Sequence, residues 1–222
     1  MKSKPLFFAF AFLILAITLK AQVADIDGHV YKIVKIGKQV WMAENLNVSH
    51  FRNGDSIPES KDWISSENGN PAWCYYNNEV ANGNKYGRLY NWYAVNDKRG
   101  LAPKGWHIPT DTEWKILINY LGGKNMACSK MKTTNGWLKS NYAPAGINNG
   151  NGTNESGFTG LPAGFRFDDL EFNALGSNFY WWSSSSNRIA AWSCTMDFNS
   201  CNIILADDIL MRDGLSIRCV KD

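Results

Sequence analysis

The stretch that decides the fold is GWHIPTDTEWKILINYLGG, residues 105–123. Thr110 can cap a helix, and Glu113, three residues later, can reach back to the backbone N–H of Thr110 and close a capping box. Gly122-Gly123 supplies a left-handed stop. The apolar residues between them recur every three or four positions and share one face: Trp114, Leu117, Ile118 and Leu121. We therefore predict a helix that starts after Thr110, ends before Gly122 and buries this stripe.

Outward from this helix, the sequence favours strands towards both ends of the chain. Residues 29–36 and 39–43 are rich in β-branched and aromatic side chains and flank Gly37-Lys38, a pattern typical of a hairpin. A second, short helix is expected over residues 89–95. The C-terminal part offers four candidate strands: residues 179–183, 190–196, 201–205 and 215–220. This order predicts an α+β fold with an N-terminal hairpin, two central helices and a C-terminal antiparallel sheet.

The first residues predict export. Lys2 and Lys4 precede the apolar run of residues 6–19, and Ala21 offers a small residue for cleavage before Gln22. The run is shorter than the roughly 20 residues that span a bilayer, so residues 1–21 are interpreted as a signal peptide and not as a retained transmembrane anchor. Residues 22–222 are then a single domain, expected to be secreted, periplasmic or on the outer cell surface.

Removal of this peptide changes the charge of the protein. Three of the 23 Lys and Arg residues lie in it, which leaves 20 basic residues against 20 acidic ones. A neutral domain lacks the basic surface typical of nucleic-acid binding, so no nucleic-acid partner is expected.

Five runs of sequence, in order along the chain, together resemble the Fibrobacter succinogenes major paralogous domain family. They are residues 27–46 (DGHVYKIVKIGKQVWMAENL), 86–95 (YGRLYNWYAV), 105–114 (GWHIPTDTEW), 181–184 (WWSS) and 216–220 (SIRCV). The family is similar to the formylglycine-generating enzyme group. The resemblance implies a C-type-lectin-like fold with both chain ends in one sheet, and it implies no settled activity.

The five cysteines would enter an oxidising compartment, so disulfides are expected. A hairpin that turns near Asp197-Phe198 would place Cys194 opposite Cys201, which predicts a structural disulfide between them. Because lectin-like folds often tie a helical region to the closing strand, the resemblance suggests Cys74 and Cys219 as a second pair. Cys128 is then left as a buried thiol. The alternative is that Cys194 and Cys201 form a redox-active, copper-binding pair, as the similarity to formylglycine-generating enzymes would imply.

A long loop rich in glycine and asparagine, residues 135–164, is the expected functional surface. Its amide and carboxylate groups can hydrogen-bond sugar hydroxyls or ligate Ca²⁺, although the spacing is not that of an EF-hand. With an aromatic platform, the candidate ligand-binding set is Asn148, Asn149, Asn151, Asn154, Glu155 and Trp181. Four other tryptophans are expected in the core: Trp41, Trp92, Trp106 and Trp114.

No catalytic residue and no metal site emerge from the sequence. His107 precedes the capped helix and is interpreted as structural, and no Gly-x-Ser-x-Gly elbow is present. The hypothesis is a non-catalytic recognition module that binds carbohydrate or an envelope protein, with no cofactor required except possible Ca²⁺. The alternative is an oxidoreductase like the formylglycine-generating enzymes.

Overall fold

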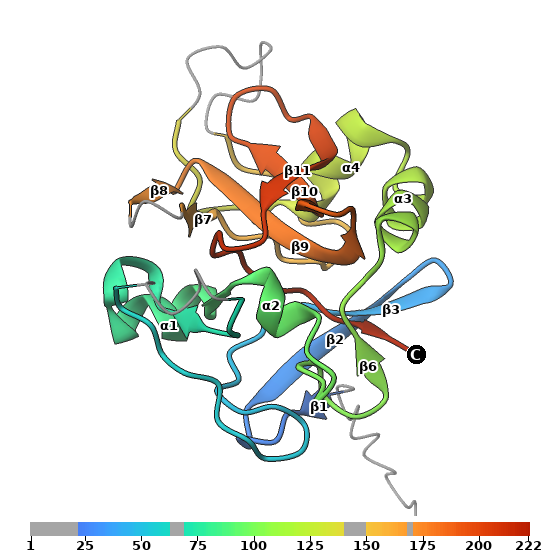
Figure 1. Ribbon diagram of the computed structural model, residues 1–222. Coiled ribbons are helices and arrows are strands. Elements are labelled where there is room, and N and C mark those ends of the chain that lie inside the picture. Colours follow the sequence, from blue (N-terminus) through green and yellow to red (C-terminus); the bar gives the residue numbers. More distant parts are fainter. Residues whose placement is uncertain (1–21, 63–68, 140–149, 168–170) are drawn as a thin grey trace, which may run out of the picture.

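The computed structural model describes residues 22–62, 69–139, 150–167 and 171–222, and within them the chain forms two five-stranded sheets and a small two-stranded one (Figure 1). The first sheet has the strand order β1-β2-β3-β12-β6 and is antiparallel throughout. Val220 pairs with both Trp41 and His107, so this sheet joins the N-terminal hairpin, the end of the chain and the entry to the central helix. The strands are β1 (Gln22–Ala24), β2 (Val30–Ile36), β3 (Gln39–Met42), β12 (Val220–Lys221) and β6 (Trp106–His107).

The second sheet has the order β11-β10-β9-β7-β8. Its last three strands in the chain form an antiparallel meander, and β7 joins β9 in parallel at Gly164 and Phe179. The strands are β7 (Ala163–Arg166), β8 (Phe172–Leu175), β9 (Asn178–Ser186), β10 (Ala190–Asp197) and β11 (Ile203–Leu210). A separate pair is made by β4 (Trp73–Cys74) and β5 (Leu89–Tyr90).

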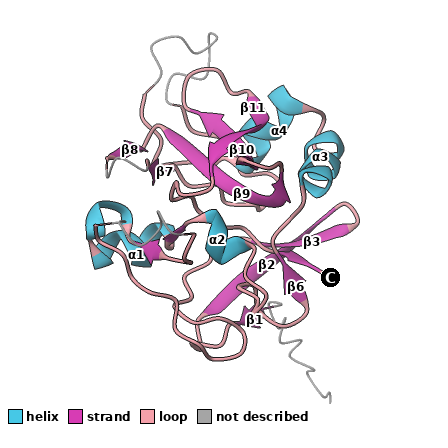
Figure 2. Ribbon diagram, viewed as in Figure 1, coloured by secondary structure: helices cyan, strands magenta, loops and turns pink. Residues whose placement is uncertain are grey.

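The described residues contain four α-helices, of which α3 and α4 lie beside the second sheet (Figure 2). They are α1 (Val80–Tyr86), α2 (Trp92–Val95), α3 (Asp111–Tyr120) and α4 (Lys124–Met131), with a 3₁₀ turn η2 (Tyr76–Asn78) before α1. None of the helices in the described ranges has the length and apolar composition needed to cross a membrane.

The predicted central helix is confirmed as α3. The Thr110 Oγ1 accepts a hydrogen bond from the Glu113 N–H at 3.2 Å, and the Glu113 Oε2 accepts one from the Thr110 N–H at 2.9 Å. Gly122 and Gly123 both have positive φ and end the helix. The chain then turns directly into α4, which the sequence did not predict.

Two predicted elements are shorter than expected. Within residues 89–95 the helix starts only at Trp92, because the Asn91 side chain caps it by accepting the Ala94 N–H, and the residues before it form β5. The predicted closing strand, residues 215–220, is reduced to Val220–Lys221. Leu215 instead hydrogen-bonds Tyr90, outside the first sheet. The mixed α and β class is nevertheless confirmed.

An aromatic cluster forms the core beneath α3. Trp114 stacks on Trp181 with ring centroids 5.6 Å apart, and Phe158 meets Trp181 edge-on at 5.1 Å. The four tryptophans predicted for the core are all buried: Trp41, Trp92, Trp106 and Trp114. Burial of large aromatic rings supplies much of the apolar area that stabilises a fold of this size.

Candidate functional site

A polar pocket of about 200 Å³ opens beside the start of β2. One wall comes from β2 and the segment 43–47, a second from the end of α1, and a third from Thr159 and Leu161 at the end of the Gly/Asn-rich loop. The residues that line it are His29, Val30, Tyr31, Ala43, Glu44, Asn45, Asn47, Gly83, Asn84, Lys85, Gly87, Thr159, Leu161 and Arg218. We call this hollow the polar pocket.

Its floor is a hydrogen-bonded network around Arg218, which is almost completely buried. The guanidinium donates to the Asn45 Oδ1 at 2.7 Å through Nη2 and at 3.1 Å through Nε. It also donates to the backbone oxygen of Phe158 at 2.6 Å and to that of Met42 at 3.2 Å. The Asn45 Oδ1 accepts a further bond from the indole N–H of Trp181 at 2.9 Å. These bonds tie the closing segment of the chain to β3 and to the Gly/Asn-rich loop.

The charge of Arg218 has no carboxylate hydrogen-bonded to it within the described ranges. Burial lowers the pKa of Arg218 to about 9, and the nearby charge of Glu44 opposes this shift. The rings of Phe158 and Trp181 lie 4.5 and 5.1 Å from the guanidinium carbon. The floor is therefore rigid and carries a positive charge that the aromatic faces stabilise.

The rim of the polar pocket carries both donors and acceptors. Glu44 accepts the Lys32 N–H at 2.9 Å and lies 3.5 Å from its ammonium. The Asn47 Oδ1 is buried and accepts no hydrogen bond from any residue that the structure describes. Lys85 is exposed and forms a cation–π contact with Tyr86, at 4.8 Å. A ligand that both donates and accepts hydrogen bonds meets partners for both roles here.

Gly87 fixes the wall nearest α1. Its φ is +78°, and a Cβ at this position would lie 2.7 Å from the backbone oxygen of Leu46. Only glycine tolerates both the positive φ and this close approach. The end of α1 is thereby held against the segment that carries Asn45 and Asn47.

The candidate ligand-binding residues do not assemble as predicted. Asn148 and Asn149 lie outside the described residues. Trp181 is fully buried in the aromatic core, so its prediction as an exposed platform is wrong. Asn151 and Asn154 hold the loop itself: the first accepts the Trp137 N–H at 3.1 Å, and the second accepts the Thr159 N–H at 2.8 Å.

Of the four members of this set that the structure describes, Glu155 alone is exposed. It lies in a second hollow and not in the polar pocket. The Gly/Asn-rich loop thus contributes to both hollows: the predicted residue Glu155 lines the second one, whereas Thr159 and Leu161, which were not predicted, line the polar pocket.

The residues that the prediction missed are Arg218 and Asn45. Both stand in quoted runs of sequence, Arg218 within SIRCV and Asn45 within MAENL. The sequence did contain a signal for Arg218, because this charged residue stands between apolar neighbours near the end of the chain. A buried charge needs partners from elsewhere in the fold.

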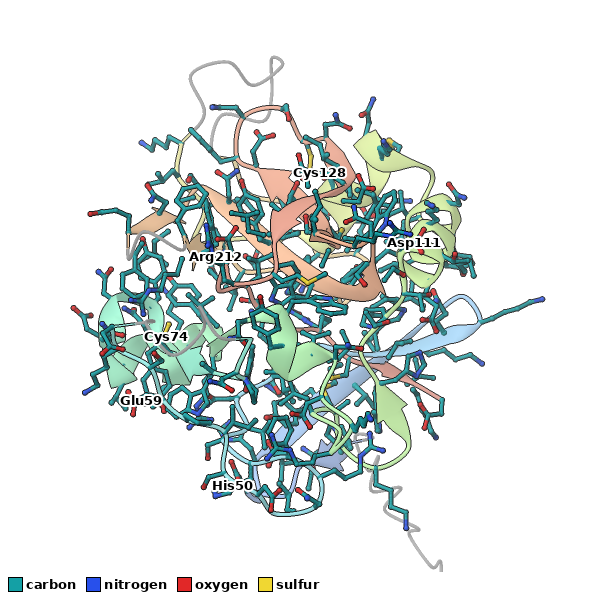
Figure 3. The ribbon with its side chains drawn as sticks, in the orientation of Figure 1. His50, Glu59, Cys74, Asp111, Cys128 and Arg212 are labelled. Carbon is teal, nitrogen blue, oxygen red and sulfur yellow. A yellow bond between two sulfur atoms is a disulfide. The ribbon has the colours of Figure 1, made fainter. Side chains whose placement is uncertain are left out.

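The predicted disulfides are corrected by the structure. Cys128 in α4 is bonded to Cys201, with Cα atoms 5.4 Å apart, and the other three cysteines are free and buried (Figure 3). Cys194 instead lies opposite Leu205, because the Asp197 carboxylate accepts the N–H groups of Asn199 and Ser200 and widens the turn.

The free thiols are poor nucleophiles. Burial raises the pKa of Cys74 to about 11 and that of Cys219 to about 12, and it also raises the pKa of Cys194. A reactive cysteine needs an accessible site that favours the thiolate. The redox pair considered for Cys194 and Cys201 is therefore not assembled.

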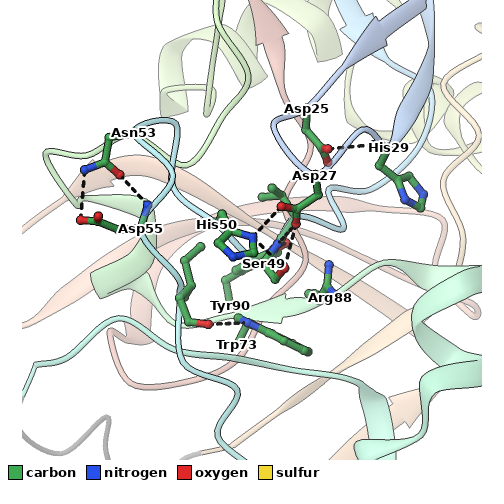
Figure 4. Close-up of polar contacts among 12 residues, drawn as sticks. Asp25, Asp27, His29, Ser49, His50, Asn53, Asp55, Trp73, Arg88 and Tyr90 are labelled. Carbon is green, nitrogen blue, oxygen red and sulfur yellow. Dashed lines mark hydrogen bonds and ion pairs between the residues drawn. The ribbon is translucent and has the colours of Figure 1, made fainter.

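A serine, a histidine and an aspartate do meet near the start of the chain, but not as a catalytic triad (Figure 4). Asp27 accepts hydrogen bonds from the Ser49 hydroxyl at 2.8 Å and pairs with the His50 Nδ1 at 2.6 Å. In a triad the serine hydroxyl bonds the histidine nitrogen that faces away from the aspartate. Here both groups bind the same carboxylate, and the Ser49 hydroxyl lies 3.3 Å from the same His50 Nδ1 that faces Asp27, so the contacts link the β1–β2 turn to residues 49–50.

His107 is also held by carboxylates. Its Nδ1 lies 2.7 Å from Asp222, and its Nε2 lies 2.7 Å from Glu113, the residue that closes the capping box. With both ring nitrogens occupied, His107 links the last residue to the start of α3, consistent with its structural interpretation. Among the described residues, no group of three or more His, Cys, Asp or Glu side chains is arranged to hold a metal ion.

Comparison with known proteins identifies one relationship. The family model of the Fibrobacter succinogenes major domain matches residues 34–221. No curated protein and no solved structure matches the chain. The matched range contains Asn45, Arg218 and most of the polar pocket.

Proposed function

The chain belongs to the Fibrobacter succinogenes major domain family, and we propose its function from the polar pocket: the protein is an exported, non-catalytic recognition module that binds carbohydrate there. The proposal includes a C-type-lectin-like fold and removal of residues 1–21. The observation that carries it is the pairing of a rigid floor with a rim of mixed donors and acceptors.

The chemistry of the rim favours a polyhydroxyl ligand. Each sugar hydroxyl both donates and accepts hydrogen bonds, and the rim offers the Lys85 ammonium as a donor with Glu44 and the Asn47 Oδ1 as acceptors. The Asn47 Oδ1 is buried, so a ligand hydroxyl reaches it only when the side chain turns into the polar pocket. Such a bond would recover the free energy that an unpartnered buried acceptor costs, so we propose Asn47 as a specific contact that depends on this rotation.

The size of the polar pocket limits what enters it. Pockets for drug-sized ligands are typically about 300–1,000 Å³, whereas this one has about 200 Å³. It therefore fits one unit of a larger molecule, with the remainder outside. We expect a terminal sugar or a single residue of a glycan to occupy it.

Binding is tested with the mature protein, residues 22–222, on a panel of neutral and acidic glycans, with Ca²⁺ and with EDTA. We expect binding in both conditions, because the rim can hold hydroxyls without a metal. Asn47→Ala and Lys85→Ala should weaken binding, whereas Lys98→Ala, which changes an exposed lysine outside the polar pocket, should not. If no glycan on the panel binds, carbohydrate recognition is refuted and a protein partner is favoured. Binding that is lost in EDTA would show that Ca²⁺ is required.

A further inference from the structure

A second hollow lies beyond the other end of β2 and is built around an exposed aromatic ring. Tyr120, in the last turn of α3, is 65% exposed, although the apolar stripe of the same helix is buried. The hollow, of about 260 Å³, has among its lining residues Lys35, Ile36, Gly37, Tyr120, Lys130 and Glu155. We call it the Tyr120 groove.

The ring of Tyr120 packs against the β2–β3 turn. Gly37 has a φ of +60°, and a Cβ there would lie 2.8 Å from the Cδ2 of Tyr120 and 3.0 Å from its Cγ. The ring thus packs on the bare backbone of the turn while most of its surface faces solvent. An aromatic side chain held this way loses little further freedom when a ligand stacks on it.

The charged side chains around this ring have no ionic partner among the described residues. Within the described ranges, Lys35, Lys130 and the Glu155 carboxylate form no ion pair and no side-chain hydrogen bond. Side chains of opposite charge therefore line the same groove without pairing with one another. They are available to hydrogen-bond a ligand between them.

We infer that the Tyr120 groove is a second carbohydrate subsite, in which a pyranose ring stacks on Tyr120 while Glu155 and the two lysines bind its hydroxyls. This inference rests on the function proposed for the polar pocket and specifies its ligand class. A flat apolar face edged by a carboxylate and ammonium groups matches a sugar ring, whose faces are apolar and whose edge is hydroxylated.

The two hollows are joined by the same two segments of chain. Val30 of β2 lines the polar pocket, Ile36 of β2 lines the groove, and these two residues share one face of the strand. At a rise of about 3.3 Å per residue, they are roughly 20 Å apart. The segment 155–161 runs alongside, with Gly157 against Val34. One sugar cannot fill both hollows, so the ligand that uses both is an oligosaccharide.

The test compares hexasaccharides with their matching monosaccharides, using glucan, xylan, chitin and alginate series and calorimetry on the mature protein. For a series that binds, Tyr120→Ala should weaken the hexasaccharide about tenfold or more and leave the monosaccharide unchanged. Tyr120→Phe should retain binding, because it keeps the ring. Ile116→Ala is the matched control, since it removes an exposed apolar side chain one turn earlier on α3, outside the groove.

The outcomes separate the two proposals. Suppose that hexasaccharides bind, and that variants of the polar pocket weaken this binding but Tyr120→Ala does not. The Tyr120 subsite is then refuted, and the polar pocket remains the proposed binding site. If Tyr120→Ala weakens the monosaccharide as much as the hexasaccharide, a distinct second subsite is likewise refuted. If no series binds, both proposals fail. Circular dichroism of each variant checks that the fold is retained.

Discussion

Removing the disulfide between Cys128 and Cys201 should destabilise the domain strongly. The bond joins α4 to the turn before β11 across 73 residues of sequence. In the chain-entropy model, closing a loop of this length restricts the unfolded chain by about 4 kcal/mol. Lys132, one turn after Cys128, donates to the backbone oxygen of Asp197 and holds the same turn. Part of the structure there therefore survives, and the loss should lie at or below that figure.

The assay is urea unfolding followed by tryptophan fluorescence, in oxidising and reducing buffer. Cys128→Ser and Cys201→Ser should each lower the free energy of unfolding by a similar amount, and the double variant should be no less stable than the weaker single one. All three should be insensitive to reductant. Cys194→Ala is the control, because that thiol is buried but unbonded. It should cost stability through lost packing and keep the difference between the two buffers.

Two results would refute this reasoning. If Cys194→Ala abolished the response to reductant, the hairpin pairing of Cys194 with Cys201 would be correct after all. If Cys128→Ser alone left that response intact, Cys128 would not be in the bond. Peptide mapping of the oxidised protein by mass spectrometry identifies the two cysteines in the disulfide independently.

Three further predictions concern the core, the turn and the pH response. Trp181→Ala should cost about 3–5 kcal/mol in urea unfolding, because it leaves a large cavity in the aromatic cluster, and an effect below about 1 kcal/mol would contradict its full burial. Gly37→Ala should cost about 1 kcal/mol or more from its positive φ and its contact with Tyr120, and adding Tyr120→Ala should recover only the contact part; full recovery would argue against backbone strain. Burial disfavours the protonated form of His107, but hydrogen bonds to Asp222 and Glu113 outweigh it and raise its pKa. The resulting stabilisation is complete below the unfolded value of about 6.5 and is lost as the pH rises through the folded value. The difference in the free energy of unfolding between wild type and His107→Gln should therefore shrink as the pH rises above the folded pKa. A difference that is constant with pH would contradict the stabilising role of these two hydrogen bonds.

Local signals in the sequence were sufficient for the central helix and the N-terminal hairpin. Thr110 and Glu113 specify the start of α3 by themselves, because their bonds lie within one turn of chain. The turn at Gly37 is similarly local. Such elements can be predicted because the energy that selects them comes from residues a few positions apart.

The polar pocket depends on long-range contacts, which is why the sequence did not predict its residues. Whether Trp181 is a platform or core depends on Trp114 and Asn45, which lie far away in the sequence. The register of the β10–β11 hairpin depends on the Asp197 side chain, which bonds the backbone of the turn. In this register Cys201 is bonded to Cys128 and not to Cys194. The Gly/Asn-rich loop lines both hollows, through Thr159 in one and Glu155 in the other, and its role in binding stays a prediction.

The central claim, that the polar pocket is the binding site, is tested most directly by NMR. A ¹⁵N-labelled protein of residues 22–222 is titrated with the glycan that gives the strongest signal on the panel, and backbone amide shifts are followed. The account predicts that the largest shifts fall on Glu44 to Asn47, Asn84 to Gly87 and Thr159, which line the polar pocket. Shifts concentrated instead around Leu101 to Lys104, which line a separate and more apolar hollow, would contradict it.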